Sequence, residues 1–317
     1  MLHCPKVSVI TPAYNAAPYI GQAIESVQAQ TLADWEMIIV DDASTDGTAQ
    51  AVQPYLSDPR IRFLQNERNM GVSYTRNRAL DVAQGEWIAV LDADDWYAPE
   101  RLEALIGCAA QMAVDVVADL MVYYTSWGSI YTISWALRAK PPKVPRRYSV
   151  EAVIRADISV QPVIRRAFLE QHQIRYHEPL RRTEDYAFLI ATLLYGAQFA
   201  LLPKPLYYYR IQPGTSVTRY DALTEGRKAM DYLQSLPVTT PRVRRLLDQA
   251  YRRRITRETY PQFARAVKQR QWRKAYQLLR NAPAVLGWLI TSLPAAVYRR
   301  LFDREKLLDP WRERAPR

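Results

Sequence analysis

The stretch Trp87–Trp96, WIAVLDADDW, is the part of the sequence that decides the fold. Its first five residues are apolar, as in a strand that is buried on both faces of a sheet. The carboxylates of Asp92, Asp94 and Asp95 follow directly. Such a cluster repels itself unless a cation is near, and hard cations such as Mg²⁺ or Mn²⁺ prefer oxygen ligands. The stretch predicts either a metal site for a substrate diphosphate or a solvated acidic turn in which Asp94 or Asp95 caps a helix.

Three more apolar runs precede this stretch, and a helical pattern follows each run. The runs predict strands at Val7–Thr11, Glu36–Val40 and Ile61–Leu64. Residues 1–112 thus alternate strand and helix four times, which is typical of an α/β domain with a largely parallel sheet. Ligands bind such sheets at the carboxyl ends of the strands, so we expect the functional site at that edge. The clearest helical patterns are Pro18–Gln30, Gly71–Ala83 and Pro99–Met112.

The pattern is less regular from residue 113 to residue 215. Strands are predicted at Val114–Tyr124, Phe199–Leu202 and Pro205–Arg210, and helices at Arg165–Gln173 and Glu184–Tyr195. From residue 240 on, the chain is helical and basic, with amphipathic spacing over Phe263–Leu279.

The charge of the chain is divided unevenly along its 317 residues. The net charge of +11 alone would suggest nucleic acid or an anionic membrane as a partner. Residues 240–317, however, hold 20 Lys and Arg against 6 Asp and Glu, a net charge of +14. Residues 1–239 hold 23 basic and 26 acidic residues, a net charge of −3. The sequence therefore predicts a slightly acidic globular body with a basic C-terminal extension.

Two further segments of the first half carry candidate binding residues. Asp41 and Asp42 end the second strand, where a carboxylate could accept the N–H of a pyrimidine base. A turn that leads into a helix would account for the residues after them, but it does not require two carboxylates at a strand end. Arg76 lies on the predicted helix Gly71–Ala83 and could reach a base or a phosphate. Taken alone, it is more typical of a solvated helical arginine.

The second half contributes an acidic pair and an aromatic strand. Glu184 and Asp185 open an apolar helix, where carboxylates are favoured by the helix dipole, but either could also serve as a general base. The run Tyr207–Arg210 precedes a polar loop in which Arg210 and Ser216 could contact a diphosphate. An edge strand and a turn explain that run equally well.

Several classes of protein lack support in the sequence. No GxGxxG, P-loop, GxSxG or CxxC motif occurs, and the three histidines show no metal-ligand spacing. The two cysteines cannot build a disulfide framework, so we expect a reducing compartment. The first residues enter a strand pattern directly, so we expect no signal peptide.

The motifs together, in this order and spacing, resemble glycosyltransferase family 2. They are VSVITPAYNAAPYI (7–20), IIVDDASTDGT (38–48), GVSYTRNRAL (71–80), LDADDW (91–96) and TEDYAF (183–188). The resemblance implies a GT-A fold, a Rossmann-like and mostly parallel sheet with flanking helices. It implies a catalytic domain over residues 1–220, with a nucleotide-sugar half of about 1–112 and an acceptor half of about 113–220. Residues 221–317 would form the basic helical extension.

The resemblance also assigns roles to individual residues. It implies that Asp185 is the catalytic base, with Glu184 beside it, and that Asp94 and Asp92 bind a divalent metal, Mg²⁺ or Mn²⁺. Many relatives carry a histidine near the metal, and Gln212 stands at the corresponding place here, which puts a third protein ligand in doubt. The expected nucleotide-sugar contacts are Pro12, Ala13, Tyr14, Asp42, Arg76, Asp92, Ala93, Arg210 and Ser216.

The function implied by the resemblance is inverting transfer from a nucleotide-diphospho-sugar, with a UDP-sugar favoured, to a glycan or polyprenyl-linked acceptor. We expect this to belong to bacterial cell-surface polysaccharide synthesis. One alternative is a catalytically silent family member that serves as a binding or scaffold subunit. A sugar nucleotidyltransferase is a weaker alternative, because TPAYNAAPYI lacks the Gly-rich basic loop that such an enzyme needs.

The basic extension predicts where in the cell the protein is located. Apolar and Trp residues flanked by Arg favour a membrane interface, which predicts contact of residues 240–317 with an anionic membrane surface. The alternative is a helical subdomain with solvated basic faces. The apolar stretch 282–298 is short and interrupted for a spanning helix. We expect a cytoplasmic protein, peripheral on the inner face of the membrane, and no nucleic-acid partner because no binding motif is present.

Overall fold

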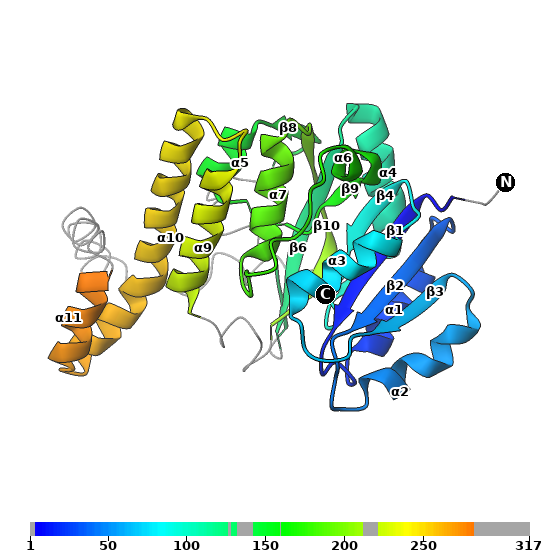
Figure 1. The fold of residues 1–317 in the computed structure, drawn as a ribbon, viewed down its shortest axis with the longest axis horizontal. Helices are drawn as coiled ribbons and strands as arrows, with labels where there is room; N and C mark the ends of the chain where they lie inside the picture. Colours follow the sequence, from blue (N-terminus) through cyan, green and yellow to red (C-terminus); the bar gives the residue numbers. More distant parts are fainter. Residues whose placement is uncertain (1–3, 126–127, 132–141, 159, 212–220, 282–317) are drawn as a thin grey trace. The chain divides into compact units, whose positions relative to one another are not determined.

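The structure is a computed structural model that describes residues 4–125, 128–131, 142–158, 160–211 and 221–281. The chain divides into two compact units, Met1–Asp248 and Gln249–Arg317. The first unit holds the sheet and all the candidate site residues that the structure describes (Figure 1).

The first half of the sheet is parallel, as the alternation of strands and helices predicted. Its order is β3-β2-β1-β4, with β1 at Val7–Ala13, β2 at Trp35–Asp41, β3 at Ile61–Gln65 and β4 at Trp87–Val90. The crossover through α1 (Ile20–Gln28) runs along the sheet in the opposite direction from the crossover through α3 (Val72–Val82). Because such crossovers are right-handed, the two helices lie on opposite faces of the sheet. Both faces are therefore covered, and every residue of β2 is buried.

The second half of the sheet is mixed. β9 (Val163–Arg165) pairs antiparallel with β4 and with β6 (Val116–Thr125), and β10 (Phe199–Arg210) pairs parallel with β6. The two reversals at β9 restore the original direction, so β4, β6 and β10 end at the same edge. β5 (Trp96–Tyr97) pairs with β10, and the sheet is extended by β7 (Gly128–Tyr131) on β6 and β8 (Arg146–Tyr148) on β10.

Helices of the first unit cover this sheet and complete the α/β architecture (Figure 1). Besides α1 and α3 they include α2 (Thr48–Val52), the 3-10 helix η1 (Gln53–Ser57), α4 (Arg101–Met112), α5 (Val150–Ala156), α6 (Arg166–Gln171), α7 (Glu184–Leu194) and α9 (Ala222–Ser235).

The sequence placed α9 in the C-terminal extension, but α9 belongs to the first compact unit. It packs against α7, and its buried Glu225 accepts hydrogen bonds from the amides of Arg181 and Arg182 at 2.6 and 3.2 Å. These contacts hold the segment that leads into α7. The division of the chain at residue 220 therefore stays a prediction about function, while the compact unit continues to Asp248.

Two elements differ in extent from the sequence prediction. β10 is one strand rather than two, with irregular pairing to β6 around Pro205, where proline supplies no N–H to the ladder. The amphipathic stretch Phe263–Leu279 is divided between α10 (Pro241–Lys268) and α11 (Trp272–Asn281). The division occurs at Arg270, which adopts a left-handed φ of 57° and ends α10.

The described helices do not include a membrane span: none of them is both long and apolar enough. The apolar stretch 282–298 lies outside the described residues.

A buried carboxylate holds the amino edge of the sheet together. Glu36, on β2, is 6% exposed and accepts hydrogen bonds from Ser8 Oγ and the Gln84 amide, both at 2.6 Å. The Gly85 amide donates to Ser8 Oγ at 2.8 Å. A Cβ at Gly85 would lie 2.4 Å from the backbone nitrogen of Ser8, so no larger residue fits without a shift of β1.

We predict that Gly85→Ala lowers the free energy of unfolding by about 1–3 kcal/mol, because the added methyl group overpacks the contact with β1. Gly107→Ala is the matched control, since Gly107 lies inside α4 and a Cβ there meets nothing within 4 Å. That variant should gain up to about 1 kcal/mol through helix propensity. Urea unfolding of both variants tests the sign, and a Gly85→Ala protein as stable as the original would contradict the packing argument.

Candidate active site

The loop after β4 is fixed by a buried carboxylate of its own. Asp95 is 1% exposed, and it accepts hydrogen bonds from the Tyr207 hydroxyl at 2.7 Å and the Arg210 amide at 2.8 Å. Burial raises the pKa of Asp95 well above its usual range, and Asp94 and Asp92 add to the shift. Both partners lie on β10, so this carboxylate ties the Asp-rich loop to the second half of the sheet. The alternative of a solvated, helix-capping turn is wrong, because Asp95 is buried and α4 begins only at Arg101.

Asp92 and Asp94, the predicted metal ligands, remain partly accessible in the same loop. Burial raises the pKa of Asp94 to about 6, with a further contribution from the charge of Asp92 and an opposing one from Arg210. The charge of Asp92 thus acts on Asp94, and the oxygens of this acidic pair suit Mg²⁺ or Mn²⁺. Two carboxylates leave most coordination positions to a substrate diphosphate and water. Within the described residues, no group of three or more His, Cys, Asp or Glu side chains converges as a metal site.

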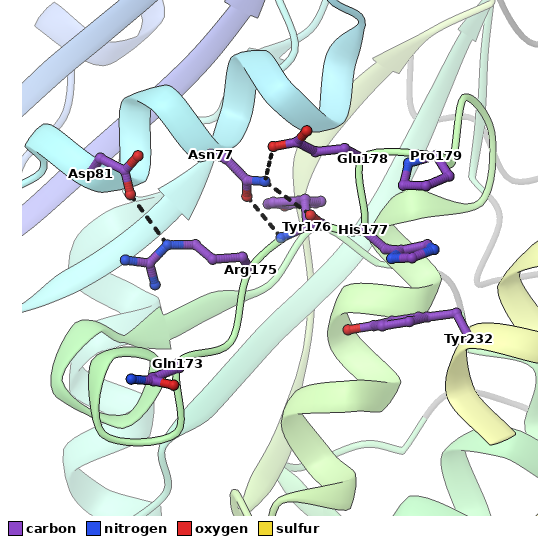
Figure 2. Close-up of a pocket in the computed structure, with 9 residues that line it drawn as sticks. All are labelled: Asn77, Asp81, Gln173, Arg175, Tyr176, His177, Glu178, Pro179 and Tyr232. Carbon is purple, nitrogen blue, oxygen red and sulfur yellow. Dashed lines mark hydrogen bonds and ion pairs between the residues drawn. The ribbon is translucent and has the colours of Figure 1, made fainter. Parts of the chain in front are cut away.

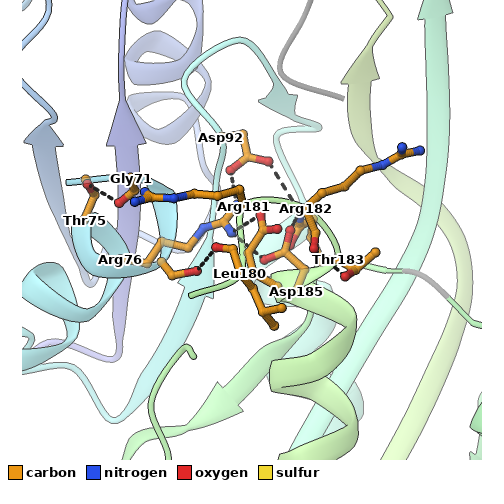
Figure 3. Close-up of polar contacts among 12 residues, drawn as sticks. Gly71, Thr75, Arg76, Asp92, Leu180, Arg181, Arg182, Thr183 and Asp185 are labelled. Atoms are coloured by element: carbon orange, nitrogen blue, oxygen red, sulfur yellow. Dashed lines mark hydrogen bonds and ion pairs between the residues drawn. The ribbon is translucent and has the colours of Figure 1, made fainter. Parts of the chain in front are cut away.

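Arg76 joins the two acidic motifs (Figure 3). Its side chain is 1% exposed, and its Nη2 lies 2.5 Å from Asp92 Oδ1. Its Nη1 lies 2.9 Å from Glu184 Oε1 and 2.8 Å from Asp185 Oδ1. The interpretation of Arg76 as a solvated helical arginine is therefore wrong. Its contact with a base or phosphate stays a prediction, but its position beside the Asp-rich loop is clear.

The acidic pair of α7 is held at an unusual backbone turn. Thr183 precedes α7 with a left-handed φ of 70°, a conformation that β-branched residues rarely adopt. It provides no side-chain cap for the helix, and the first turn begins with Glu184 and Asp185. The turn directs Asp185 toward Arg76 (Figure 3), and Glu184 pairs with the same guanidinium. More than a favourable helix dipole therefore holds the two carboxylates there.

Asp185 has the properties of a general base. Burial raises the pKa of Asp185 to about 7; the charge of Arg76 opposes the shift, while Glu184 and Asp92 add to it. The Asp185 side chain as a whole is nevertheless 22% exposed, so it is not fully closed off from a substrate. A carboxylate with a pKa near the working pH takes a proton more readily than an ordinary one.

Gln161 is a site residue that the sequence analysis missed. Its side chain is 5% exposed, and its Nε2 donates to Asp185 Oδ2 at 3.0 Å and to Asp92 Oδ2 at 3.5 Å. The backbone carbonyl oxygen of Gln161 accepts from Arg101 Nη2 at 2.7 Å. Arg101 in turn forms a fully buried ion pair with Asp119, at 2.8 Å. Gln161 lies in an irregular segment without a motif, so no sequence pattern could have singled it out.

Asp42 has a clear internal role. It is 3% exposed, and it accepts hydrogen bonds from Asn66 Nδ2 and from the amides of Met70 and Gly71, at 2.7, 2.8 and 2.7 Å. Asp42 thereby fixes the loop that leads into α3, and so it positions Arg76. These three bonds occupy most of the acceptor capacity of the carboxylate, and its predicted contact with a nucleotide base stays a prediction.

The loops after β1 and β2 are bonded to each other. The Asn15 amide donates to Ser44 Oγ at 2.9 Å, and the Thr45 amide donates to Asn15 Oδ1 at 2.9 Å. Of the predicted donor contacts in the β1 segment, Tyr14 is 44% exposed, whereas the side chain of Ala13 is buried in the core. Pro12 is half-buried. Tyr14 is therefore the residue of this loop with the most surface to offer a ligand.

The remaining predicted contacts differ in their surroundings. The Ala93 side chain is buried in the hydrophobic core, 5% exposed, so only its backbone could face a ligand. Arg210 Nε donates to the Asp94 carbonyl oxygen at 2.9 Å, which brings Arg210 to the Asp-rich loop as predicted. Ser216 and Gln212 lie outside the described residues.

A pocket of about 500 Å³ lies next to this cluster, around Tyr176 and His177 (Figure 2). The Arg76 guanidinium lies 5.2 Å from the centre of the Tyr176 ring, so Tyr176 separates the pocket from the carboxylates. Polar groups of the pocket bond to one another: the Tyr176 amide donates to Asn77 Oδ1 at 2.8 Å, and Arg175 pairs with Asp81. None of the predicted site residues that the structure describes lines it.

The topology and the site together define an α/β protein of the GT-A class. Its parallel half-sheet ends in an Asp-rich loop, and an acidic pair from a later helix faces that loop across one arginine. The chain belongs to glycosyl transferase family 2, whose sequence model matches residues 8–173, slightly more than half of the chain.

Similarity to known proteins supports this family membership. Succinoglycan biosynthesis protein ExoO of Rhizobium meliloti is 36% identical over 220 residues, which is 67% of this chain and 62% of that protein. The chain thus matches less than two thirds of the length of this relative. The structure of S. aureus TarS 1–349 in complex with UDP-GlcNAc is similar with a TM-score of 0.70 at 23% identity, over 93% of this chain and 87% of that one. Mannosyltransferase PcManGT from Pyrobaculum calidifontis, in complex with GDP-Man and Mn²⁺, is similar with a TM-score of 0.54 at 19% identity, over 96% and 89%. The two structures share the fold.

We predict that Arg76→Met lowers the free energy of unfolding by about 3–5 kcal/mol at pH 8, because three carboxylates lose their buried partner. Without Arg76, the pKa of Asp185 in the folded state rises further, because the charge of Arg76 is what opposes the shift caused by burial. The folded protein then binds more protons than the unfolded chain, so the loss shrinks as the pH falls toward 5.

Urea unfolding at both pH values measures this effect. Arg78→Met is the matched control on the same helix, because Arg78 Nη1 bonds to Asn66 Oδ1 at 2.7 Å and pairs with no carboxylate in the described part of the chain. Its loss should be smaller and should not depend on pH in this range. Equal, pH-independent losses in both variants would contradict the proposed charge balance.

Proposed function

We propose that the chain is an inverting glycosyltransferase that moves a sugar from a nucleotide-diphospho-sugar to a hydroxyl group of a glycan or lipid-linked acceptor. The observation that carries the proposal is the arginine bridge, in which Arg76 binds Asp92 of the Asp-rich loop and Asp185 of α7. The bridge holds Asp185, a carboxylate that can act as a general base, opposite Asp92 and Asp94. These two carboxylates suit a metal and a diphosphate. Membership of glycosyl transferase family 2 supports the same reaction class.

The donor in this proposal is a UDP-sugar, bound by the half of the domain that ends near residue 112. TarS, which shares the fold, is known in complex with UDP-GlcNAc. Tyr14 and Asp42 lie at the ends of β1 and β2, where a nucleotide binds in an open α/β sheet. The nucleotide would then run along the carboxyl edge, with its diphosphate at Asp94 and its sugar near Asp185.

Asp92 and Asp94 would hold Mg²⁺ or Mn²⁺ in this proposal. PcManGT, which shares the fold, is known in complex with Mn²⁺. When bound, the metal would neutralise charge on the diphosphate leaving group. Arg210 lies close enough to contribute positive charge, since its Nε donates to the Asp94 carbonyl oxygen.

The chemical step in this proposal is a direct displacement. Asp185 removes the proton of the acceptor hydroxyl, and the hydroxyl oxygen attacks the anomeric carbon from the face opposite the diphosphate. The configuration at that carbon inverts. Arg76 and Gln161 hold the Asp185 carboxylate through its two oxygens, so its orientation is fixed before the acceptor arrives.

We predict that Asp185→Asn slows nucleoside diphosphate release at least 10²-fold, since the amide cannot accept the proton, while the donor still binds. In the original protein the rate should fall as the pH drops through about 7, because a protonated Asp185 is no base. The assay offers a panel of nucleotide-sugars with Mn²⁺, and scores thermal stabilisation and diphosphate release separately. Release by Asp185→Asn at nearly the original rate would refute the base assignment, and stabilisation without any release would favour a silent binding subunit.

The acceptor in this proposal is a growing surface polysaccharide on a lipid carrier, and the protein works on the cytoplasmic face of the membrane. ExoO, named for succinoglycan biosynthesis, supports a role in polysaccharide synthesis.

The second compact unit supports a location at the membrane surface. In α11, Trp272 and Tyr276 lie one turn apart and are 64% and 69% exposed, whereas Ala275 is buried. Arg273 and Arg280 continue the exposed side, as in helices that lie in a membrane interface.

We predict that the full chain sediments with vesicles containing phosphatidylglycerol and not with phosphatidylcholine alone. Replacing Arg273, Lys274 and Arg280 by Glu should reduce binding at least tenfold, since each basic residue near the surface contributes about 1 kcal/mol. Added salt should weaken the binding of the original protein. The matched control replaces Arg155, Arg166 and Arg175 of the first unit by Glu, and equal losses in both triple variants would contradict a localised membrane contact.

A further inference from the structure

An aromatic cluster lies beside the Asp-rich loop, and its three rings have no role in the function proposed above. The rings of Trp96 and Tyr208 are stacked, with centroids 5.2 Å apart and an interplanar angle of 4°. Tyr124 meets Trp96 edge-on, with centroids 5.2 Å apart and an interplanar angle of 76°. The Arg210 guanidinium lies 4.7 Å from the Trp96 ring. The four side chains come from β5, β6 and β10.

Strand pairing puts this cluster on the face of the sheet that carries Ile10 and Val90, opposite the core residues that pack against α1 and α4. Directly paired residues point to the same face, so the face can be followed from strand to strand. Val90 pairs with Ile10, and Ile88, two residues before it, pairs with Ile164 of β9. Ile164 pairs with Val116, which shares its face with Val122 and Tyr124 farther along β6. The face continues through the pairs Val122–Tyr208, Tyr124–Arg210 and Tyr208–Trp96.

The opposite face of the same strands is closed. Tyr97 and Tyr207, which alternate with Trp96 and Tyr208, are 2% and 0% exposed and pack around Arg101 of α4. On the cluster side, Trp96 and Tyr208 are only half-buried, and Tyr124 is 38% exposed. If the rings of Trp96, Tyr124 and Tyr208 served only the hydrophobic core, we would expect them to be as deeply buried as Tyr97 and Tyr207.

The cluster is joined to the donor machinery. Trp96 directly follows Asp95, and Arg210 contacts both the Trp96 ring and the Asp94 carbonyl oxygen. The carboxyl ends of β6 and β10 share their edge with the end of β4, where Asp92 lies. In the order of the strands, the cluster lies on the far side of β4 from β1 and β2, whose ends we assign to the nucleotide.

We propose that Trp96, Tyr124 and Tyr208 form a subsite for a pyranose ring of the acceptor glycan, with Arg210 at its edge. This rests on the proposed glycosyltransferase function. The apolar C–H face of a pyranose matches the electron-rich face of an aromatic ring, and the hydroxyl groups at its rim match the N–H donors of arginine. A nucleobase also stacks on aromatic rings, but the assigned nucleotide position is on the other half of the sheet. The subsite would hold the acceptor so that its reacting hydroxyl faces Asp185.

Saturation-transfer NMR of the full chain with methyl β-D-glucopyranoside, methyl β-D-galactopyranoside and methyl N-acetyl-β-D-glucosaminide tests the subsite. At least one pyranoside should receive saturation, and mannitol, which has no ring, should receive none. Trp96→Ala should weaken the binding about tenfold, a loss that corresponds to roughly 1.4 kcal/mol. Trp96→Phe keeps a ring face and should retain most of the binding. Trp272→Ala removes an exposed tryptophan from the second unit and serves as the matched control.

Thermal stabilisation by UDP with Mn²⁺ is measured on the same proteins, so that failure of the donor proposal is seen separately. The proposal predicts that UDP with Mn²⁺ still stabilises Trp96→Ala while the pyranoside signal is lost. It is overturned if no pyranoside binds the original protein, if Trp96→Ala binds it equally well, or if that variant loses UDP and the pyranoside together. Absence of UDP stabilisation in the original protein would refute the donor assignment, while the pyranoside signals would still decide whether the aromatic cluster binds sugar.

Discussion

The site depends on one buried guanidinium, that of Arg76. Three carboxylates lie within 3 Å of its nitrogens, and they belong to the loop after β4 and to the first turn of α7. Burying a charge is costly unless it is paired, and here both sides of the pairing are required. Without the arginine the carboxylates would repel one another, and without the carboxylates the arginine would be a buried charge with no partner. This mutual requirement fixes α7 against the parallel half of the sheet.

A second buried ion pair stabilises the surroundings of Arg76 and its carboxylates. Arg101 and Asp119 connect α4 with β6, and Arg101 also holds the backbone of Gln161. Gln161 passes this constraint on to Asp185, since its Nε2 donates to that carboxylate. The orientation of the candidate base is thus set by a chain of contacts that begins in the core. Such contacts pre-organise a site, because fewer rotamers have to be frozen when a substrate arrives.

The sequence predicted the parts of this arrangement that depend on local pattern. Apolar runs that end in carboxylates located β2, β4 and the edge at which they lie, and the motif order located Asp92 and Asp185. It could not predict that Arg76 is buried, because burial depends on which distant carboxylates meet it. Asp95 was grouped with Asp92 and Asp94, either in a metal site or in a solvated turn, whereas the Tyr207 hydroxyl, more than one hundred residues later in the chain, binds it in the interior. Gln161 carried no signal at all, because a single amide in an irregular segment becomes functional only through its neighbours in space.

The charged residues of the body and those of the C-terminal extension have different roles. Among the described residues, the positive groups that hold the site together include Arg76, Arg101 and Arg210, and all three belong to the body, residues 1–239, whose net charge is −3. Each is placed by specific contacts, two of them in full burial, so salt in the surrounding solution screens them little. The +14 of residues 240–317 has a different character, since Arg273, Lys274 and Arg280 are exposed on α11. Charges of that kind act through a summed, salt-sensitive attraction that carries no geometric precision. A net charge of +11 therefore describes neither part of the protein: the body needs a few positive groups at fixed positions, and the extension presents many positive groups to a surface.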